Sequence, residues 1–489
     1  MATGTARSNL ETFAEHIFLF GGHEKMNSKK LTGLLISCMM MTNPLAAGFA
    51  AGEETTKVEV VETQPGETNA QTVIGIDIND TGSQIGAVVS AEADNAVADL
   101  TVTNAVQTTS EDDMAAGAYI SSTAEQSDAR LTAGEVSTTG EDDASAVFAE
   151  ASGKQSAAAV IAENVAAVSE NGSATGAEIS SSGEQSSVVL TAGNVTAEGA
   201  ADAFALRTNA SGESSETVVN AEKISAAAAE GNAVGVAVYT DGKGTETTVN
   251  TGEVSAKANE NATAVRVDVD GSNHTLNLTA GEVTAEGKSD AAGINANLWM
   301  DSSDNTLNVK ADTITSTAEQ TEAYGIASHE FGASNAINVT AGDVKVEGKS
   351  MATGIEAIVS EEGSDSTTVI KTGNLDVVTD SAATGIHGRA AGNGNTIELT
   401  GENVTVGGGR YSIGLDAESY YGNNTDEQVG SDNKTIINAG DVKATAASQG
   451  KTGSSSATGV SGYAEGEGNT AEITAGNIIA EVVSEGGQK

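Results

Sequence analysis

The chain is poor in cysteine, proline, aromatic residues and positive charge, and each shortage narrows what the protein can be. Its 489 residues include one cysteine, two prolines and only 3% aromatic residues. The single cysteine, Cys38, lies in a segment that we expect to be removed, so the mature chain would have no disulfide, no thiol nucleophile and no cysteine-bound metal. A core of large aromatic rings is also excluded, which leaves small aliphatic side chains packed in thin layers.

The shortage of positive charge excludes one large class of partners. Lys and Arg together number 23, against 69 Asp and Glu, which gives a formal net charge of −46. Nucleic acids would be repelled by a surface of this charge, and docking on anionic lipid is disfavoured for the same reason. The charge also keeps an extended body soluble and separated from its neighbours.

Long apolar runs are scarce as well, and the one near the N-terminus predicts a secretory signal peptide. The run Leu31–Met41 follows two lysines and is interrupted by Pro44. Small residues precede Ala51, which predicts cleavage after Ala50. The apolar part is too short to span a bilayer, so residues 26–50 are interpreted as a signal peptide rather than a membrane anchor.

The sequence divides into four parts on this basis. Residues 1–25 carry mixed charge and no repeat, and are interpreted as an upstream extension. Residues 51–73 are a polar, acidic lead-in after the signal peptide of residues 26–50. The remaining residues, 74–489, are predicted to form one long repeat domain.

A unit of about 30 residues recurs along this domain. In its clearest copy, residues 276–296, apolar and polar side chains alternate, and the phase restarts after Gly281 and again after Gly287. This alternation predicts strands with one apolar face each. The side chains predicted to point inward are Leu276, Leu278, Ala280, Val283, Ala285, Ile294 and Ala296.

Two markers hold the phase of the repeat. The first is an Ala-Gly-Glu/Asn/Asp-Val corner, found well preserved or degenerate around Asn104, Gly134, Glu163, Gly193, Glu222, Gly252, Gly281, Asp312, Gly342, Gly373, Glu402, Gly440 and Gly476. The second is a glycine before an apolar residue, at Gly117, Gly176, Gly235, Gly293, Gly325, Gly354, Gly385, Gly414 and, displaced, Gly459. Two markers in step indicate a solenoid rather than a bias of composition.

The alternation decides which solenoid is expected. Helical repeats of this length need apolar residues every three or four positions, and propeller blades need more aromatics and a longer period. The sequence therefore predicts an all-β fold, a right-handed parallel β-helix with about three strands per coil of roughly 30 residues. Two longer spacings predict surface loops inserted at residues 419–432 and 447–456.

A signal peptide followed by an acidic, cysteine-free array resembles the passenger region of a Gram-negative autotransporter, a type V secretion protein. The units that carry the resemblance are Thr279–Val283, Ala292–Ile294, Ala352–Ile355 and Ala383–Ile386. The resemblance implies export by the Sec pathway, passage through an outer-membrane translocator barrel, and display at the cell surface or release from it. The translocator is absent from this chain, and the sequence stops at Lys489 after an ordinary coil, so we expect a C-terminal truncation.

Carboxylates offer the first candidate chemistry. Two acidic triplets follow corner motifs one coil apart, Glu111, Asp112 and Asp113, then Glu141, Asp142 and Asp143. Stacked carboxylates suit Ca²⁺, but the Gly-Gly-x-Gly-x-Asp series of calcium-binding β-rolls is missing. We therefore interpret the triplets as solvated corners and expect no metal there.

The sequence predicts no catalytic residue, no cofactor and no metal site. After the predicted signal peptide there are three histidines, His274, His329 and His387, and they fall at different points of the repeat, which predicts separate surface imidazoles rather than a shared site. The Gly-x-Ser-x-Gly nucleophile motif is missing.

Three aromatic residues, Trp299, Tyr420 and Tyr421, are the candidate contact residues, because rings are so scarce. An exposed ring can pack on a sugar or a protein partner. The alternative is that Trp299 only covers a coil face and that the tyrosines pack within their own loop.

These features favour a secreted or surface-displayed structural or adhesin-like β-helix that is not an enzyme and contacts a host glycan or protein. Two alternatives stay open. One is a polysaccharide-active enzyme on the same fold, which needs clustered acidic and basic residues on neighbouring coils. The other is an aggregation factor whose rods associate with each other.

Overall fold

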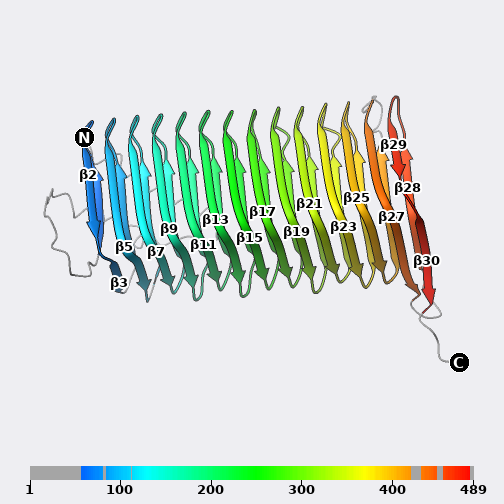
Figure 1. The fold of residues 1–489 in the computed structure, drawn as a ribbon, viewed down its shortest axis with the longest axis horizontal. Coiled ribbons are helices and arrows are strands. Elements are labelled where there is room, and N and C mark those ends of the chain that lie inside the picture. Colours follow the sequence, from blue (N-terminus) through cyan, green and yellow to red (C-terminus); the bar gives the residue numbers. More distant parts are fainter. Residues whose placement is uncertain (1–56, 81–83, 112, 420–430, 449–454, 485–489) are drawn as a thin grey trace.

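The computed structural model describes residues 57–80, 84–111, 113–419, 431–448 and 455–484. Within these residues every regular element is a β-strand, and every pairing between strands is parallel. Figure 1 shows the strands stacked side by side along one long axis, with the sequence running from one end of the stack to the other. The predicted all-β solenoid is confirmed: the strands form about 12 turns with coils of roughly 30 residues.

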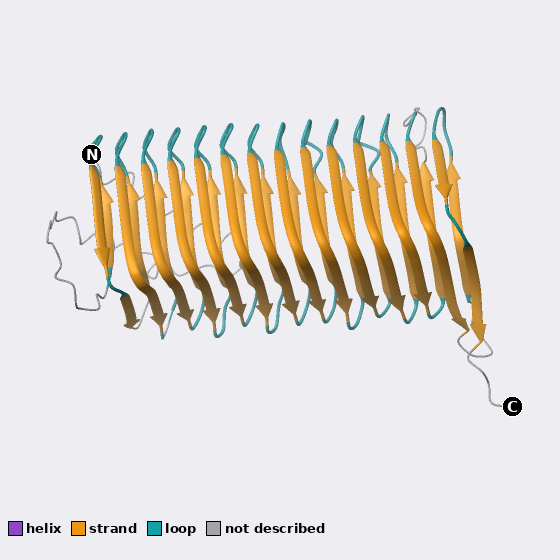
Figure 2. Cartoon of the chain, viewed as in Figure 1, coloured by secondary structure: helices purple, strands orange, loops and turns teal. Residues whose placement is uncertain are grey.

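The strands belong to two sheets that run the length of the stack (Figure 2). We name them the short-strand sheet, with 14 strands, and the long-strand sheet, with 16. In the short-strand sheet the strands are β1 (Val58–Glu62), β4 (Gln84–Ala91), β6 (Ala115–Ser122), β8 (Ala144–Ala151), β10 (Ala174–Ser181), β12 (Ala203–Ala210), β14 (Ala233–Thr240), β16 (Ala262–Val269), β18 (Ala291–Leu298), β20 (Glu322–Glu330), β22 (Met351–Val359), β24 (Ala382–Ala390), β26 (Tyr411–Ser419) and β28 (Ser456–Ala464).

The long-strand sheet alternates with it along the chain. Its strands are β2 (Thr68–Val73), β3 (Ile76–Asp80), β5 (Val97–Ser110), β7 (Asp128–Gly140), β9 (Ala157–Ser169), β11 (Ser187–Gly199), β13 (Glu216–Ala228), β15 (Glu246–Ala258), β17 (Thr275–Gly287), β19 (Thr306–Ala318), β21 (Ala336–Gly348), β23 (Thr367–Thr379), β25 (Thr396–Gly408), β27 (Lys434–Ser448), β29 (Thr470–Thr474) and β30 (Ile478–Ser484). Each strand inside the stack pairs with its counterpart one coil earlier and one coil later, and the strands at the two ends pair on one side.

The Ala-Gly-x-Val corner bends the long strand without ending it. In β11 the pairing with β13 runs up to Ala192, skips Gly193 and resumes at Asn194. Two arms of one strand therefore lie on either side of the corner. The three segments expected in each coil are present, but two of them form one continuous strand.

The interior is the column of small aliphatic side chains that the alternation predicts. All seven residues predicted to point inward in the clearest copy are at most 2% exposed, whereas the intervening Thr279, Glu282 and Glu286 face solvent. The same buried cluster continues through every coil from Val58 to Val442. Because each coil covers its neighbours, the apolar faces are hidden only in the stack.

The structure also explains why the two sequence markers stay in phase. The glycine of the second marker lies where the short strand passes against the corner valine of the long strand. At Gly235, an added Cβ would lie 2.7 Å from Cγ1 of Val254 and 2.7 Å from the carbonyl oxygen of Ala264. The glycine of one marker and the valine of the other are therefore two sides of one packing contact.

A buried polar ladder crosses the turn that leads from each short strand into the next long strand. Its members are Ser127, Ser156, Ser186, Ser215, Thr245, His274, Asn305, Asn335, Ser366, Asn395 and Asn433. In the Asn-rich half, each amide oxygen accepts a backbone N–H of the coil before: Asn305 from His274 at 2.8 Å, and Asn433 from Asn395 at 3.0 Å. These bonds satisfy backbone groups that would otherwise be buried without partners.

The solenoid begins earlier than the sequence pattern indicates. Strands β1 and β2 lie within residues 51–73, the segment expected to be an acidic lead-in, and they pair with β4 and β5. The residues of the predicted signal peptide, the upstream extension and most of the two insertion loops lie outside the described residues.

Candidate functional site

The aromatic side chains are not spread over the solenoid. Among the described residues, each of the nine aromatics lies on a strand of the short-strand sheet or directly after one. They are Tyr119, Phe148, Phe204, Tyr239, Trp299, Tyr324, Phe331, Tyr411 and Tyr463. This face therefore concentrates a residue type that is scarce in the chain as a whole.

Trp299, which is exposed, and Phe331, which is half-buried, form an aromatic pair at the ends of β18 and β20. Their rings are stacked, with centroids 5.8 Å apart and planes 8° apart. Trp299 is 44% exposed, and Met300 beside it is 67% exposed. The expectation that Trp299 only covers a coil face therefore does not describe it fully, because half of a large ring remains open to contact.

A second aromatic pair lies nearer the N-terminal end of the same face. Tyr119 and Phe148 stack with centroids 5.4 Å apart, and Ile85, Val88 and Ala116 pack against them. These residues make a small apolar cluster on the outer side of the sheet, separate from the interior column. Burial is the first cause that raises the pKa of the Tyr119 hydroxyl, followed by the nearby charge of Glu150.

Arginine side chains lie next to several of the aromatic rings on this face. The guanidinium of Arg207 lies 4.8 Å from the ring centroid of Phe204, a cation–π distance. One coil earlier, Glu178 is the register partner of Arg207, and both are 8% exposed. Met114, Asp143, Ser173 and Thr175 line a shallow hollow with these three residues.

Arg266 and Asp268 form an ion pair two residues apart on β16. Nε of Arg266 lies 2.6 Å from the carboxylate of Asp268, and its guanidinium lies 5.8 Å from the ring centroid of Tyr239. The amide of Asn297, one coil later, donates to Asp268 at 3.0 Å. Side chains on this face are thus connected across three neighbouring coils.

Two of the three histidines meet at one carboxylate, contrary to the expectation of separate imidazoles. Nε2 of His329 on β20 lies 3.1 Å from Oε1 of Glu356 on β22, and Nδ1 of His387 on β24 lies 3.6 Å from Oε2. Burial alone would raise the pKa of Glu356, but the bonds and charges of the two imidazoles lower it to about 2. Glu356 therefore stays ionised between the two rings.

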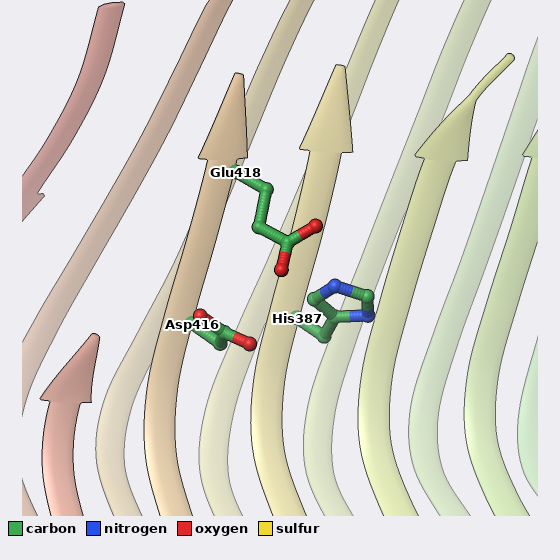
Figure 3. Close-up of side chains that lie close together, drawn as sticks. All are labelled: His387, Asp416 and Glu418. Atoms are coloured by element: carbon green, nitrogen blue, oxygen red, sulfur yellow. The ribbon is translucent and has the colours of Figure 1, made fainter. Parts of the chain in front are cut away.

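His387 also faces two carboxylates on its other side. Figure 3 shows Asp416 and Glu418 on β26 beside the imidazole, with Glu418 reaching across toward the ring. The ligand atoms of the three side chains lie within 4.8 Å of one another. Burial lowers the pKa of His387, but Glu356, Asp416 and Glu418 together outweigh it, so the net shift is upward.

The third histidine is not on the surface. His274 is buried in the turn ladder, where its Nδ1 lies 2.6 Å from Oγ1 of Thr245. Burial is the main cause that lowers its pKa. The expectation of a surface imidazole is therefore wrong for this residue, which takes the place that asparagine fills in later coils.

The acidic triplets serve the turns between long and short strands. The carboxylate of Asp143 accepts the backbone N–H of Ser173 at 2.7 Å, and Asp113 accepts the N–H of Met114 at 2.9 Å. Burial is the largest cause that raises the pKa of Asp143. The bond from Ser173 lowers it, and the charges of Asp142 and Asp113 raise it further. Glu111, Asp142 and Glu141 are exposed or half-buried, and Asp112 lies outside the described residues.

Sequence reasoning missed the aromatic face and the histidine cluster. A signal for the first was present, because five of the nine described aromatics lie two to six residues after a glycine of the second marker: Tyr119, Tyr239, Trp299, Phe331 and Tyr463. Tyr420 and Tyr421, the other two predicted contact residues, lie outside the described residues.

Comparison with known proteins adds no relative. No family model matches this chain, no curated protein matches it, and no solved structure matches its fold. Within the described residues, no helix is long and apolar enough to cross a membrane.

Proposed function

We propose that the protein is an exported scaffold, displayed on the cell surface or secreted, that binds a host glycan or protein through the outer face of the short-strand sheet. The observation that carries the proposal is the gathering of all nine described aromatics on or beside this sheet. Strand stacking does not require them, because the long-strand sheet forms without any among its described residues.

The aromatic pair of Trp299 and Phe331 is the proposed centre of contact. An open ring buries much apolar area for little loss of conformational freedom, and sugar rings and protein partners both use such surfaces. A polar group stands close by along the sequence: Asn297, two residues before Trp299, is half-buried, and its amide donates to Asp268 one coil earlier at 3.0 Å. A ring with an amide nearby suits a ligand that has both an apolar face and hydroxyls.

Export is supported by the sequence of residues 26–50 and by the autotransporter resemblance. The partner that this route requires is an outer-membrane translocator, and the net charge of −46 would keep displayed rods apart. The proposal predicts that the mature protein recovered outside a Gram-negative host begins at Ala51. Recovery of cytoplasmic protein with residues 26–50 intact would contradict the proposed route.

We further propose that the chain has no catalytic activity. The carboxylates beside Arg207 and Arg266 are nearly closed to a substrate, since Glu178 is 8% exposed and Asp268 is 7% exposed. The hollow that Glu178 and Arg207 line with Asp143 is the observation that favours the alternative, a polysaccharide-active enzyme. Release of new reducing or unsaturated ends from a polysaccharide panel, lost in Glu178→Gln, would establish that alternative instead.

The decisive experiment for binding compares two exposed apolar residues on opposite sheets. Purified protein is tested against a glycan array and against host cells, with the variants Trp299→Ala and Ile161→Ala. Ile161 on β9 is 51% exposed and serves as the matched control. We expect Trp299→Ala to lose about tenfold or more of the affinity, because ring anchors are worth roughly 2 kcal/mol or more in such interfaces, and Ile161→Ala to keep it.

Equal binding by the two variants would contradict a role for this face. Sedimentation of the wild-type rod at several salt concentrations distinguishes the other alternative, self-association, from binding to a host ligand. Charge repulsion should oppose rod contacts most strongly at low ionic strength. Sedimentation as a single species at every salt concentration would exclude the alternative.

A further inference from the structure

The cluster of His387, Asp416 and Glu418 has the donor set and the placement of a metal site. Asp416 and Glu418 are two residues apart on β26, so both project from the outer face of the strand. His387 on β24 is the register partner of Asp416. Three potential ligands thus come from two adjacent strands that the solenoid holds in fixed register.

The distances are within reach of one ion. The ligand atoms lie within 4.8 Å of one another. A metal at about 2.1 Å from each atom would bring them to roughly 3.4 Å apart in a tetrahedral arrangement. Small changes of side-chain rotamer would close this difference, and all three residues are half-buried rather than enclosed.

A separate observation points to the same ligand. Nδ1 of His387 lies 3.6 Å from Oε2 of Glu356 on β22, and β24 lies between β22 and β26, the strand that carries Asp416 and Glu418. Histidines that bind metals commonly donate their other ring N–H to a carboxylate, which fixes the tautomer and directs the free lone pair at the ion. Glu356 occupies that position, and its second partner His329 holds it in place.

We propose that His387, Asp416 and Glu418 bind one divalent transition-metal ion of the zinc class, with Glu356 as the residue that orients His387. One imidazole with two carboxylates suits Zn²⁺ and its first-row neighbours, whereas Ca²⁺ and Mg²⁺ take oxygen ligands alone. The acidic surface raises the local concentration of cations. Arg389, the register partner of Glu418, is the charged neighbour with which the ion competes.

Isothermal titration of the full chain with Zn²⁺, after removal of any affinity tag, tests the proposal. We expect one tight Zn²⁺ per chain, and His387→Asn and Asp416→Asn should each weaken binding by about tenfold or more. Glu356→Gln should weaken it less than either, because it removes an orienting contact and no ligand. Glu286→Gln on the long-strand sheet is the matched control, and it should leave the affinity unchanged.

A second readout separates coordination from nonspecific attraction. Co²⁺ in place of Zn²⁺ should give a ligand-field absorption band in the wild type that is absent in His387→Asn. Thermal unfolding without metal checks that each variant folds. If His387→Asn does not fold, Glu418→Gln takes its place in both measurements, because it also removes a proposed ligand. Zn²⁺ binding that survives His387→Asn, or that Glu286→Gln weakens equally, would overturn the proposal.

Discussion

The outer face of the long-strand sheet stacks identical side chains over runs of two or three coils, whereas the outer face of the short-strand sheet carries different groups along the stack. On the long-strand sheet, Asn277, Asn308 and Asn338 form an amide ladder with bonds of 2.9 and 3.1 Å. Lysine and glutamate pair across coils in the same way, as Lys257 does with Glu286 at 2.9 Å.

The short-strand sheet has the same backbone ladder but a different series of side chains. Along it stand an apolar cluster, arginines with aromatic rings, the pair of Trp299 and Phe331, and the cluster of His387 with its carboxylates. Stacking identical residues is sufficient to build a solenoid face, since each residue satisfies its copy one coil away. A face that departs from this repetition is therefore the better candidate for recognition.

The comparison concerns the outer faces, so the interior should respond alike in both sheets. Leu278→Ala on β17 and Ile294→Ala on β18 each remove a fully buried aliphatic side chain. We expect each to lower the free energy of unfolding by about 2–5 kcal/mol, from lost burial and the cavity left behind. Urea unfolding followed by circular dichroism measures this, with the exposed Thr279→Ala as control.

A loss confined to one of the two variants would contradict a single shared core. It would show instead that the core residues of one sheet provide most of the stability and that the other sheet is packed loosely against them.

Glu330 is a carboxylate at an inward position of the short-strand sheet, where its neighbours are aliphatic. It therefore tests how the interior responds to a buried charge. Its register neighbours are Leu298 and Val359, and it is 1% exposed. One carboxylate oxygen accepts from Gly332 at 3.0 Å and from Asn335 at 2.6 Å. Burial is the main cause that raises its pKa from 4.5 to about 7.

The sign of the resulting pH dependence follows from this upward shift. The folded protein holds the proton more tightly than the unfolded chain, so the stabilisation is complete below about pH 4.5 and is lost as the pH rises to about 7. A shift of this size corresponds to about 3 kcal/mol. Glu330→Gln should therefore be more stable than the wild type at pH 8 and similar at pH 4.5.

Thermal unfolding of both proteins from pH 4.5 to 8 measures the difference, and subtraction removes the contribution of the other carboxylates. A difference that does not change with pH would show that Glu330 is ionised in the folded state throughout this range.

The two asparagine ladders provide the smallest expected effect. Asn395 in the buried turn ladder accepts the N–H of Ser366 at 2.9 Å and donates to two backbone carbonyls, whereas Asn308 belongs to the outer ladder. Asn395→Ala should cost about 1–3 kcal/mol, because it leaves buried backbone groups without partners. Asn308→Ala should cost less, about 0.5 kcal/mol, because water replaces its bonds.

Urea unfolding with a common baseline compares the two variants. Equal costs would contradict the assignment of the turn ladder as the buried and structurally required one.

The sequence was most informative where a residue repeats its role in every coil. The inward positions of the unit around Leu276 are all buried as predicted, because alternation along a strand fixes which side chains share a face. The sequence placed the corner at Gly193 correctly, but it did not predict that one strand continues through that corner. Whether the backbone pairing continues through a bend depends on the neighbouring coils.

The histidine cluster shows why the candidate site was harder to predict. His329 and Glu356 are 27 residues apart, which is shorter than the regular repeat, whereas Glu356 and His387 are 31 apart and are register partners on neighbouring strands. His329 reaches Glu356 diagonally, because the register partner of Glu356 is Ala327. A diagonal contact depends on side-chain rotamers, and these leave no periodic mark in a sequence.

By itself, the sequence determined the period, the β class and the inward column, because these follow from spacing and alternation along the chain. Only the tertiary structure decided which side chains stand together on the outer faces. It gathered the described aromatics beside one sheet and brought His387 next to Asp416 and Glu418. The reason is physical: lateral neighbours in a solenoid are set by the register between coils, and a shift of one residue would replace every one of them.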